Sequence, residues 1–253
     1  MTLHPVSQFA AVAAVQYGAI GRCQLSKLGL TREAIRHLVR RQVIRPVSRD
    51  VFVVSTHRSS WWQQIWVAIL DAGPRAVASH RTAAKLLGMP GFDGCPIDTL
   101  IPERFSHRST STPFHASSLL PGDHLTSRDG IPTTSLARTI FDLAGLSSPR
   151  RLRAGQSFVH ADKVARTLDT ALNRGLDSDE LDLVVADLGK RGRPGTALMR
   201  RLLDERDDGY VATESELEDL LIEVLQSHGL PLPVRQATLG DHDRPIGRID
   251  FTY

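Results

Sequence analysis

Residues 18–54 read GAIGRCQLSKLGLTREAIRHLVRRQVIRPVSRDVFVV, and this stretch decides what the N-terminal part of the chain can form. The pattern predicts a short helix, a turn at Gly29, a second helix beginning after Thr31, and β-prone runs at 43–47 and 51–54. Thr31 is suited to be the N-cap of the second helix, because its hydroxyl can accept a hydrogen bond from a backbone N–H two or three residues later. The order of these elements is that of two helices followed by a β-hairpin.

The expected second helix has an apolar face and a basic face. Ile35, Leu38 and Val39 follow one another at i, i+3, i+4 spacing, so they form one apolar stripe. The opposite face carries charged and polar side chains, namely Glu33, Arg36, His37 and Arg40, with Arg32 and Arg41 on its flanks. A basic helix presented after a tight turn is the geometry that enters the major groove of DNA. The stretch therefore predicts a winged helix-turn-helix that binds double-stranded DNA through Arg22, Thr31, Arg32, Arg36, His37, Arg40, Arg41, Arg45 and Arg49.

Charge is distributed unevenly along the chain. Residues 1–54 contain eight Lys or Arg against two acidic residues, a net charge of +6, although the whole chain carries only +3. Positive charge concentrated on one small module is typical of a surface that contacts phosphates. Residues 161–253 carry 19 acidic against 12 basic residues, which argues against a second nucleic-acid-binding surface there. An ordinary helical hairpin with a solvated basic face remains the alternative interpretation of residues 18–54.

Composition limits the class of protein. With 253 residues, 41% of them hydrophobic and 23% charged, the chain has the composition of a globular protein of two or three domains. No apolar run approaches the roughly 18 residues that a membrane helix needs, and the first residues lack the basic start of a signal peptide. Cys23 and Cys95 match no zinc or redox spacing, and the ten histidines are scattered. We therefore expect a cytoplasmic protein with no membrane contact, no metal and no cofactor.

Residues 18–54 also resemble the N-terminal winged helix of AbiEi-type antitoxins, which belong to type IV toxin–antitoxin systems. The resemblance rests on Leu25, Leu28, Gly29, Leu30, Ile35 and Arg36, and on the hairpin residues Arg49, Asp50, Val51 and Phe52. The family has Gly and Tyr where this chain has Asp50 and Phe52. Aspartate tolerates the left-handed backbone better than most residues, so we expect the turn at Asp50 to persist. An acidic residue at the tip weakens the case that this wing contacts phosphates.

Residues 56–150 are expected to form a mixed α/β middle domain. Helices are predicted at 59–71, 79–89 and 135–144, and strands at 97–101, 114–119 and 131–133. Ser79-His80-Arg81 and the later run from Thr134 to Ala144 resemble the middle domain of AbiEi-like proteins. Arg138 and Asp142 are four residues apart on an expected helix, so we predict a structural ion pair between them.

Residues 151–253 are expected to begin with helices at 164–174, 178–189 and 195–205. The basic loop 189–195 lacks the spacing of a phosphate loop and is predicted to be a solvated turn. The last forty residues, with strands predicted at 234–238 and 246–251, resemble a Vsr-like endonuclease of the PD-(D/E)XK class. The resemblance implies Glu218 and Asp250 as magnesium ligands. The strand that follows in that family is absent after Asp250, so we expect an inactive remnant that would bind Mg²⁺ only if completed.

Together these features predict an α+β protein with three parts. These are a winged helix-turn-helix at 1–55, an AbiEi-like middle domain at 56–150, and a helical segment with a truncated nuclease-like region at 151–253. The resemblance implies a sequence-specific DNA-binding protein, an antitoxin-type repressor of its own operon, and a nucleotidyltransferase-type toxin as its partner. Two alternatives stay open. One is a Mg²⁺-dependent DNA endonuclease, and the other is an interaction module that neutralises a toxin through its middle domain.

Overall fold

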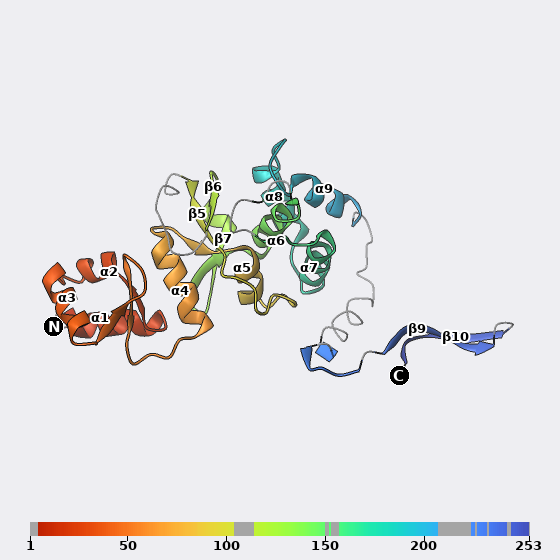
Figure 1. Ribbon diagram of the computed structural model, residues 1–253. Helices are drawn as coiled ribbons and strands as arrows, with labels where there is room; N and C mark the ends of the chain where they lie inside the picture. The colour runs from red at the N-terminus through yellow and green to blue at the C-terminus, as the bar shows by residue number, and fades with distance from the viewer. Residues whose placement is uncertain are drawn as a thin grey trace.

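The protein is built from both helices and strands, as the sequence predicts (Figure 1). The computed structural model describes residues 5–103, 114–149, 152, 157–206, 224–225, 227–231, 233–241 and 244–252, with the backbone alone for 5–7 and 234–252. Within these residues, no helix has both the length and the apolar character needed to cross a membrane.

Residues 5–54 pack helices against a small antiparallel sheet. In chain order the elements are α1 (Pro5–Val15), β1 (Ala19–Gly21), α2 (Arg22–Lys27), α3 (Arg32–Arg40), β2 (Ile44–Pro46) and β3 (Val51–Val54). Strand β3 lies in the centre and pairs antiparallel with both β1 and β2. The core of this unit contains Phe9, Ile20, Leu25, Ile35, Ile44 and Phe52. The two helices and the hairpin expected here are therefore confirmed, within a few residues.

The next part of the chain forms a mixed five-stranded sheet. Its strands are β4 (Val77–Ala78), β5 (Thr99–Pro102), β6 (His115–Ser117), β7 (Leu125–Arg128) and β8 (Ile131–Thr134), in the spatial order β6-β5-β4-β8-β7. Strands β4 and β8 are parallel neighbours, and so are β5 and β6. A short 3₁₀ turn, η2 (Gly122–His124), precedes β7. Helix α4 (Trp61–Ala72) packs Ile65 and Ile69 into a core with Ile101 and Ile131 from the sheet.

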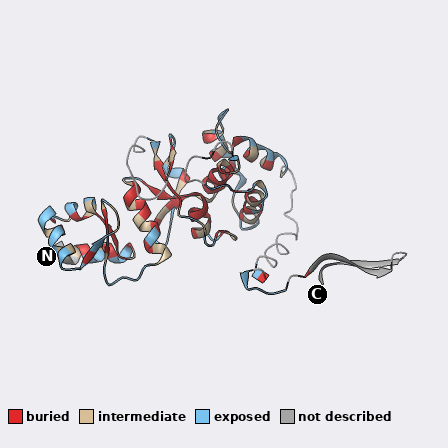
Figure 2. Ribbon diagram, viewed as in Figure 1, coloured by how far each residue is buried: buried red, intermediate tan, exposed pale blue. Residues whose placement is uncertain are grey.

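Helices α5 (His80–Leu86) and α6 (Leu136–Gly145) follow the parallel strands β4 and β8, and three further helices pack beside α6. These are α7 (Ala161–Asn173), α8 (Ser178–Leu188) and α9 (Thr196–Asp204). One hydrophobic core contains residues of α5 to α9, including Ala84, Phe141, Leu168, Val184 and Met199. Figure 2 shows this buried interior in red around α6. The division expected at residue 150 therefore falls within a shared core.

Helix α4 also joins the N-terminal unit to the sheet, because it contacts β1 and β3 as well as β4 and β5. The Gln63 side chain donates a hydrogen bond from Nε2 to the carbonyl oxygen of Tyr17 at 2.8 Å. The rings of Tyr17 and Trp62 stack with centroids 5.7 Å apart. Gly18 has φ 86°, and a Cβ there would lie 2.6 Å from the ring of His57, so a side chain at this junction is excluded.

The last described part is an antiparallel hairpin of β9 (Val234–Asp241) and β10 (Arg244–Thr252). This confirms the two strands predicted for the tail. Asp250 lies in β10, where the backbone alone is described, and Glu218 lies outside the described residues.

The short strands β1, β4 and β7 were not predicted, because runs of two to four residues carry too little periodicity to distinguish them from loops. The turn expected at Asp50 is present, with the Val47 N–H bonded to the carbonyl oxygen of Val51, but Asp50 does not adopt the left-handed backbone. Among the described non-glycine residues, positive φ occurs at Tyr17, Gln42, Arg75, His80 and Asp129. Gln42, with φ 55°, makes the turn from α3 to β2, and the hairpin closes without strain at Asp50.

Candidate functional site

The outward face of α3 is a basic surface. Ile35 is 2% exposed, and Leu38 and Val39 are half-buried against the core of the N-terminal unit. The side chains on the other side of the helix are exposed: Arg32, Glu33, Arg36, His37, Arg40 and, at the C-cap, Arg41. We call the five basic residues of this set, with Glu33 left out, the α3 basic face. Within the described part of the chain, none of its side chains has an ion-pair partner.

Thr31 fixes where this face begins. Its Oγ1 accepts a hydrogen bond from the backbone N–H of Ala34 at 3.1 Å, which confirms the predicted N-cap. Glu33 lies in the first turn, and His37 and Arg40 lie in the last, so these charges complement the helix dipole. The sequence prediction also placed Thr31 among the DNA contacts, and the structure gives its hydroxyl a capping role.

Arg22 differs from the other predicted contacts because the unit itself uses its guanidinium. Nε donates to Asp50 Oδ1 at 3.1 Å, Nη2 donates to the carbonyl oxygen of Arg49 at 2.8 Å, and the group lies 5.0 Å from the centre of the Phe52 ring. These contacts hold the β2–β3 turn against the start of α2. They also neutralise the acid that stands near the tip of the hairpin.

Two further predicted contacts lie on the hairpin. Arg45 is exposed on β2, and Arg49 is exposed in the turn between β2 and β3. Apart from Arg22 and Thr31, the predicted DNA contacts thus lie in two exposed groups, one on α3 and one on the hairpin. For the predicted magnesium ligands, the side chains of Glu218 and Asp250 are not described. No group of three or more potential metal-ligating side chains occurs among the residues that are described.

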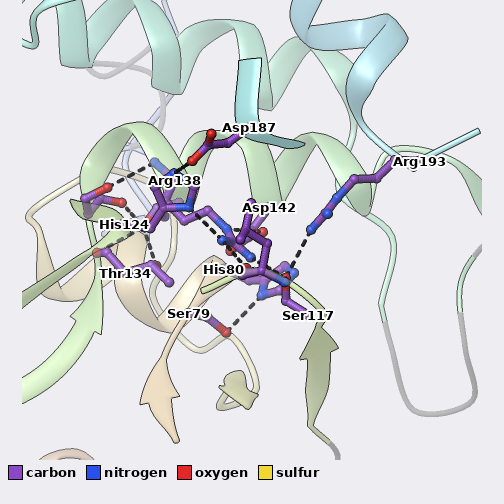
Figure 3. Close-up of polar contacts among 12 residues, drawn as sticks. Ser79, His80, Ser117, His124, Thr134, Arg138, Asp142, Asp187 and Arg193 are labelled. Carbon is purple, nitrogen blue, oxygen red and sulfur yellow. Dashed lines mark hydrogen bonds and ion pairs between the residues drawn. The ribbon is translucent and has the colours of Figure 1, made fainter. Parts of the chain in front are cut away.

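A second candidate site is a buried polar cluster in the middle of the chain (Figure 3). Strands β4 and β8 run parallel, so their carboxyl ends meet at one edge of the sheet. Ser79 and His80 follow β4 directly, and Ser135 follows β8 and caps α6 by accepting from Arg138 N–H at 3.3 Å. Ligand sites in open α/β sheets commonly lie at such an edge.

An ion pair between Arg81 and Asp98 supports one side of the cluster. Arg81 donates from Nε and Nη2 to the two oxygens of Asp98 at 2.7 and 2.8 Å, and both side chains are 5% exposed. His115 Nε2 lies 3.0 Å from Asp98 Oδ1. Burial raises the pKa of Asp98, but the hydrogen bonds from Arg81 and His115 outweigh it and hold that pKa below its usual range.

His80 stacks on His115 with ring centroids 3.6 Å apart, and its Nδ1 lies 2.9 Å from Ser79 Oγ. Burial, and then the neighbouring His115, lower the pKa of His80 to about 3. His80 is therefore neutral at pH 7. Its backbone φ of 48° is unusual for a non-glycine residue. Such a conformation persists only where the surrounding structure stabilises it, and residues of this kind cluster at functional sites.

Arg138 lies at the centre of the cluster and its side chain is fully buried. It donates to Asp142 Oδ1 at 2.9 Å, Ser117 Oγ at 3.1 Å and the carbonyl oxygen of Leu119 at 3.1 Å. Its Nη1 lies 3.0 Å from His124 Nδ1, and because a guanidinium always donates, His124 carries its proton on Nε2. The predicted pair of Arg138 with Asp142 is therefore confirmed, within a wider network.

A cleft of about 380 Å³ opens beside this network. It is lined by His80, Ser117, Arg138, Asp142, Lys190 and Arg193, among others. Arg193 reaches from the loop after α8 and donates to Ser117 Oγ at 3.2 Å, so Ser117 links two guanidinium groups (Figure 3). Burial, and then the nearby Arg138, lower the pKa of Arg193.

Most of this cleft was not foreseen from the sequence. The loop 189–195 was predicted to be a solvated turn, which holds for the exposed Lys190 and Arg191 but is wrong for Arg193. The sequence patterns give no prediction of a functional role for Asp98, His115 or Ser117. Each lies in or directly before a short strand, and polar residues at strand ends were the available signal.

No protein-family model matches the chain. The chain is 29% identical over 189 residues to uncharacterized protein MT2308 of Mycobacterium tuberculosis (strain CDC 1551 / Oshkosh). The same identity and length hold for uncharacterized protein Rv2248 of Mycobacterium tuberculosis (strain ATCC 25618 / H37Rv). Each match covers 74% of this chain and 63% of the relative, so the chain spans less than two thirds of the length of these curated relatives. Neither name states an activity.

Proposed function

We propose that residues 1–55 form a winged helix-turn-helix domain that binds double-stranded DNA with sequence specificity. The order α1-β1-α2-α3-β2-β3 supports this, because a helix pair followed by a β-hairpin is the arrangement of that domain. In the proposal α3 enters the major groove as the recognition helix, and the β2–β3 hairpin forms the wing beside it.

One observation carries the proposal: the α3 basic face is exposed, and its side chains have no ion-pair partner among the described residues. Cations that are already paired must give up that pairing before they contact DNA, whereas unpaired exposed cations bind phosphates at no such cost. The apolar side of α3 is held in the core by Ile35, so the basic face is presented in a fixed orientation.

The wing fits the same role. Arg45 and Arg49 are exposed on the hairpin, and the pairing of Asp50 with Arg22 reduces the repulsion that an acid near the tip would cause. We therefore assign Arg45 and Arg49 to phosphate contacts. Arg22 is assigned to support of the turn.

We propose that the role of the protein in the cell is that of an antitoxin-type repressor of its own operon. Binding near its promoter would exclude RNA polymerase, and the neighbouring gene would encode a nucleotidyltransferase-type toxin. This part rests on the AbiEi-type resemblance of residues 18–54 and of the run from Thr134 to Ala144. The proposal assigns no catalytic step to the chain and places it in the cytoplasm with its DNA.

A salt titration tests the proposal. Fluorescence anisotropy is measured with a duplex taken from upstream of the gene and with a scrambled duplex of equal length. About four to six phosphate contacts predict that log affinity falls linearly with log salt, with a slope of about −4 to −5. The upstream duplex should bind more tightly at every salt concentration. A slope near zero, or no binding at low salt, would exclude the α3 basic face as a DNA-binding surface.

A further inference from the structure

The cleft beside Arg138 carries more positive charge than the acidic side chains among the described residues around it neutralise. Arg138 is paired with Asp142, but Lys190 and Arg193 have no ion-pair partner among the described residues. Of the other lining residues, Glu103 is the one that adds a negative charge, and His80 is neutral at pH 7. An anion bound between Lys190 and Arg193 would therefore meet two cations.

Arg193 is available to such an anion. It is half-buried at the wall of the cleft, and its Nη2 is committed to Ser117 Oγ. Ser117 Oγ accepts from Arg138, from Arg193 and, at 3.3 Å, from the Leu119 N–H, and its hydroxyl donates to the carbonyl oxygen of Leu119 at 2.6 Å, so the hydroxyl is fully used in fixing these groups. The remaining N–H groups of Arg193 are held in a fixed position, which is how planar guanidinium groups recognise phosphate oxygens.

The same cleft also offers an unused acceptor. Asp142 is 8% exposed, and its Oδ1 accepts from Arg138. Its buried Oδ2 has no hydrogen-bond partner among the described residues. A buried carboxylate oxygen without a hydrogen-bond donor destabilises the fold, because its hydrogen bonds to water are lost and not replaced. A ligand with a hydroxyl or amino group would supply that donor.

The volume of the cleft, about 380 Å³, lies in the range of small-molecule sites. Together with the contacts described above, this volume indicates the class of ligand. We propose that the cleft binds a small phosphate monoester that carries hydroxyl groups. Arg193 and Lys190 hold the phosphate, and Asp142 Oδ2 accepts a hydrogen bond from a hydroxyl. This site is independent of the α3 basic face, so neither proposal depends on the other.

Calorimetric titration of the full chain at constant ionic strength tests the site. The probes are ribose 5-phosphate and adenosine 5′-monophosphate, which share the hydroxylated phosphate but represent a sugar phosphate and a nucleotide. Methyl phosphate and inorganic phosphate lack the hydroxylated part. We expect saturable binding of at least one hydroxylated probe, at least about tenfold tighter than methyl phosphate, a difference of about 1.4 kcal/mol. Whichever of the two binds more tightly identifies the source of the ligand.

The matched variants are Arg193→Ala and Arg191→Ala. Both remove one positive charge from the same loop, but Arg191 is exposed and does not line the cleft. Arg193→Ala should weaken binding at least about tenfold, and Arg191→Ala should leave it unchanged. Thermal unfolding checks that each variant is folded. If Arg193→Ala does not fold, Lys190→Ala replaces it, since Lys190 is exposed at the rim and should also weaken binding.

Three results would overturn the assignment. The first is the absence of saturable binding of every probe at millimolar concentration. The second is an equal loss of affinity in Arg191→Ala and the cleft variant, which would mean general attraction to a basic loop. The third is an affinity for methyl phosphate equal to that for both ribose 5-phosphate and adenosine 5′-monophosphate, which would remove the role given to Asp142.

Discussion

Replacing Arg36 by alanine separates base recognition from phosphate binding on α3. Arg36 is exposed one turn after the Thr31 cap, where recognition helices present side chains to base edges. It has no ion-pair partner among the described residues, so no internal contact is lost when it binds DNA. A bidentate contact from arginine to guanine discriminates by about 1–3 kcal/mol, or about 5- to 150-fold in affinity.

The matched control is Arg41→Ala. Arg41 is exposed at the C-cap of α3, and its backbone N–H bonds to the carbonyl oxygen of His37, a contact that alanine keeps. Because Arg41 stands at the far end of the helix, we expect it to contact a phosphate. Its loss should weaken binding to upstream and scrambled duplexes alike and make the salt slope shallower by about one unit.

Both variants are measured by fluorescence anisotropy on the two duplexes at one salt concentration and then across a salt series. Arg36→Ala should weaken binding to the upstream duplex by the factor given above and leave binding to the scrambled duplex nearly intact. If the two variants behave alike on both duplexes, the α3 basic face binds phosphates without reading bases. Specificity would then have to come from the wing or from DNA shape.

Three predictions concern stability, each measured by urea unfolding. Asp142→Asn leaves the buried Arg138 guanidinium without its counter-charge, so it should lower the free energy of unfolding by about 3–5 kcal/mol. The control is Asp187→Asn, which changes a half-exposed carboxylate. This variant should lower the free energy of unfolding by less than about 1 kcal/mol. The pKa of His80 is lowered to about 3, so the unfolded chain binds more protons between pH 6.5 and 3 and stability falls as pH drops through that window. From pH 8 to pH 5 the loss due to His80 should be about 2 kcal/mol, and His80→Gln should remove that part of the pH dependence; an unchanged dependence would show that His80 protonates freely. Thr31→Ala should cost about 1 kcal/mol, with Ser26→Ala, exposed on α2, as the control.

The features that the sequence predicts are those that local pattern controls. The α3 stripe of Ile35, Leu38 and Val39 and the Thr31 cap lie within one turn or two of each other, and both are confirmed. The same holds for α6 to α9, whose apolar residues recur over several turns.

The polar cluster could not be predicted in the same way, because its contacts join residues far apart in the chain. Ser117 meets Arg138 across 21 positions and Arg193 across 76. No spacing rule connects these residues, and a basic Gly-Pro loop has the same composition whether its arginine is solvated or enters a cleft. The prediction is wrong for Arg193 because tertiary packing, and not the composition of the loop, determines the direction in which the Arg193 side chain points.

The parallel pairing of β4 with β8 also has a consequence for the order of folding. Thr133 bonds to the carbonyl oxygen of Ala78 across 55 positions, whereas Ile44 pairs with Val54 around a short turn. Contacts between distant residues require larger loops to close and form more slowly than local ones. Because the N-terminal end of the chain is also synthesised first, we expect residues 5–54 to fold before β8 is available to pair with β4. A nascent chain would then present the α3 basic face before the cleft at Arg138 exists.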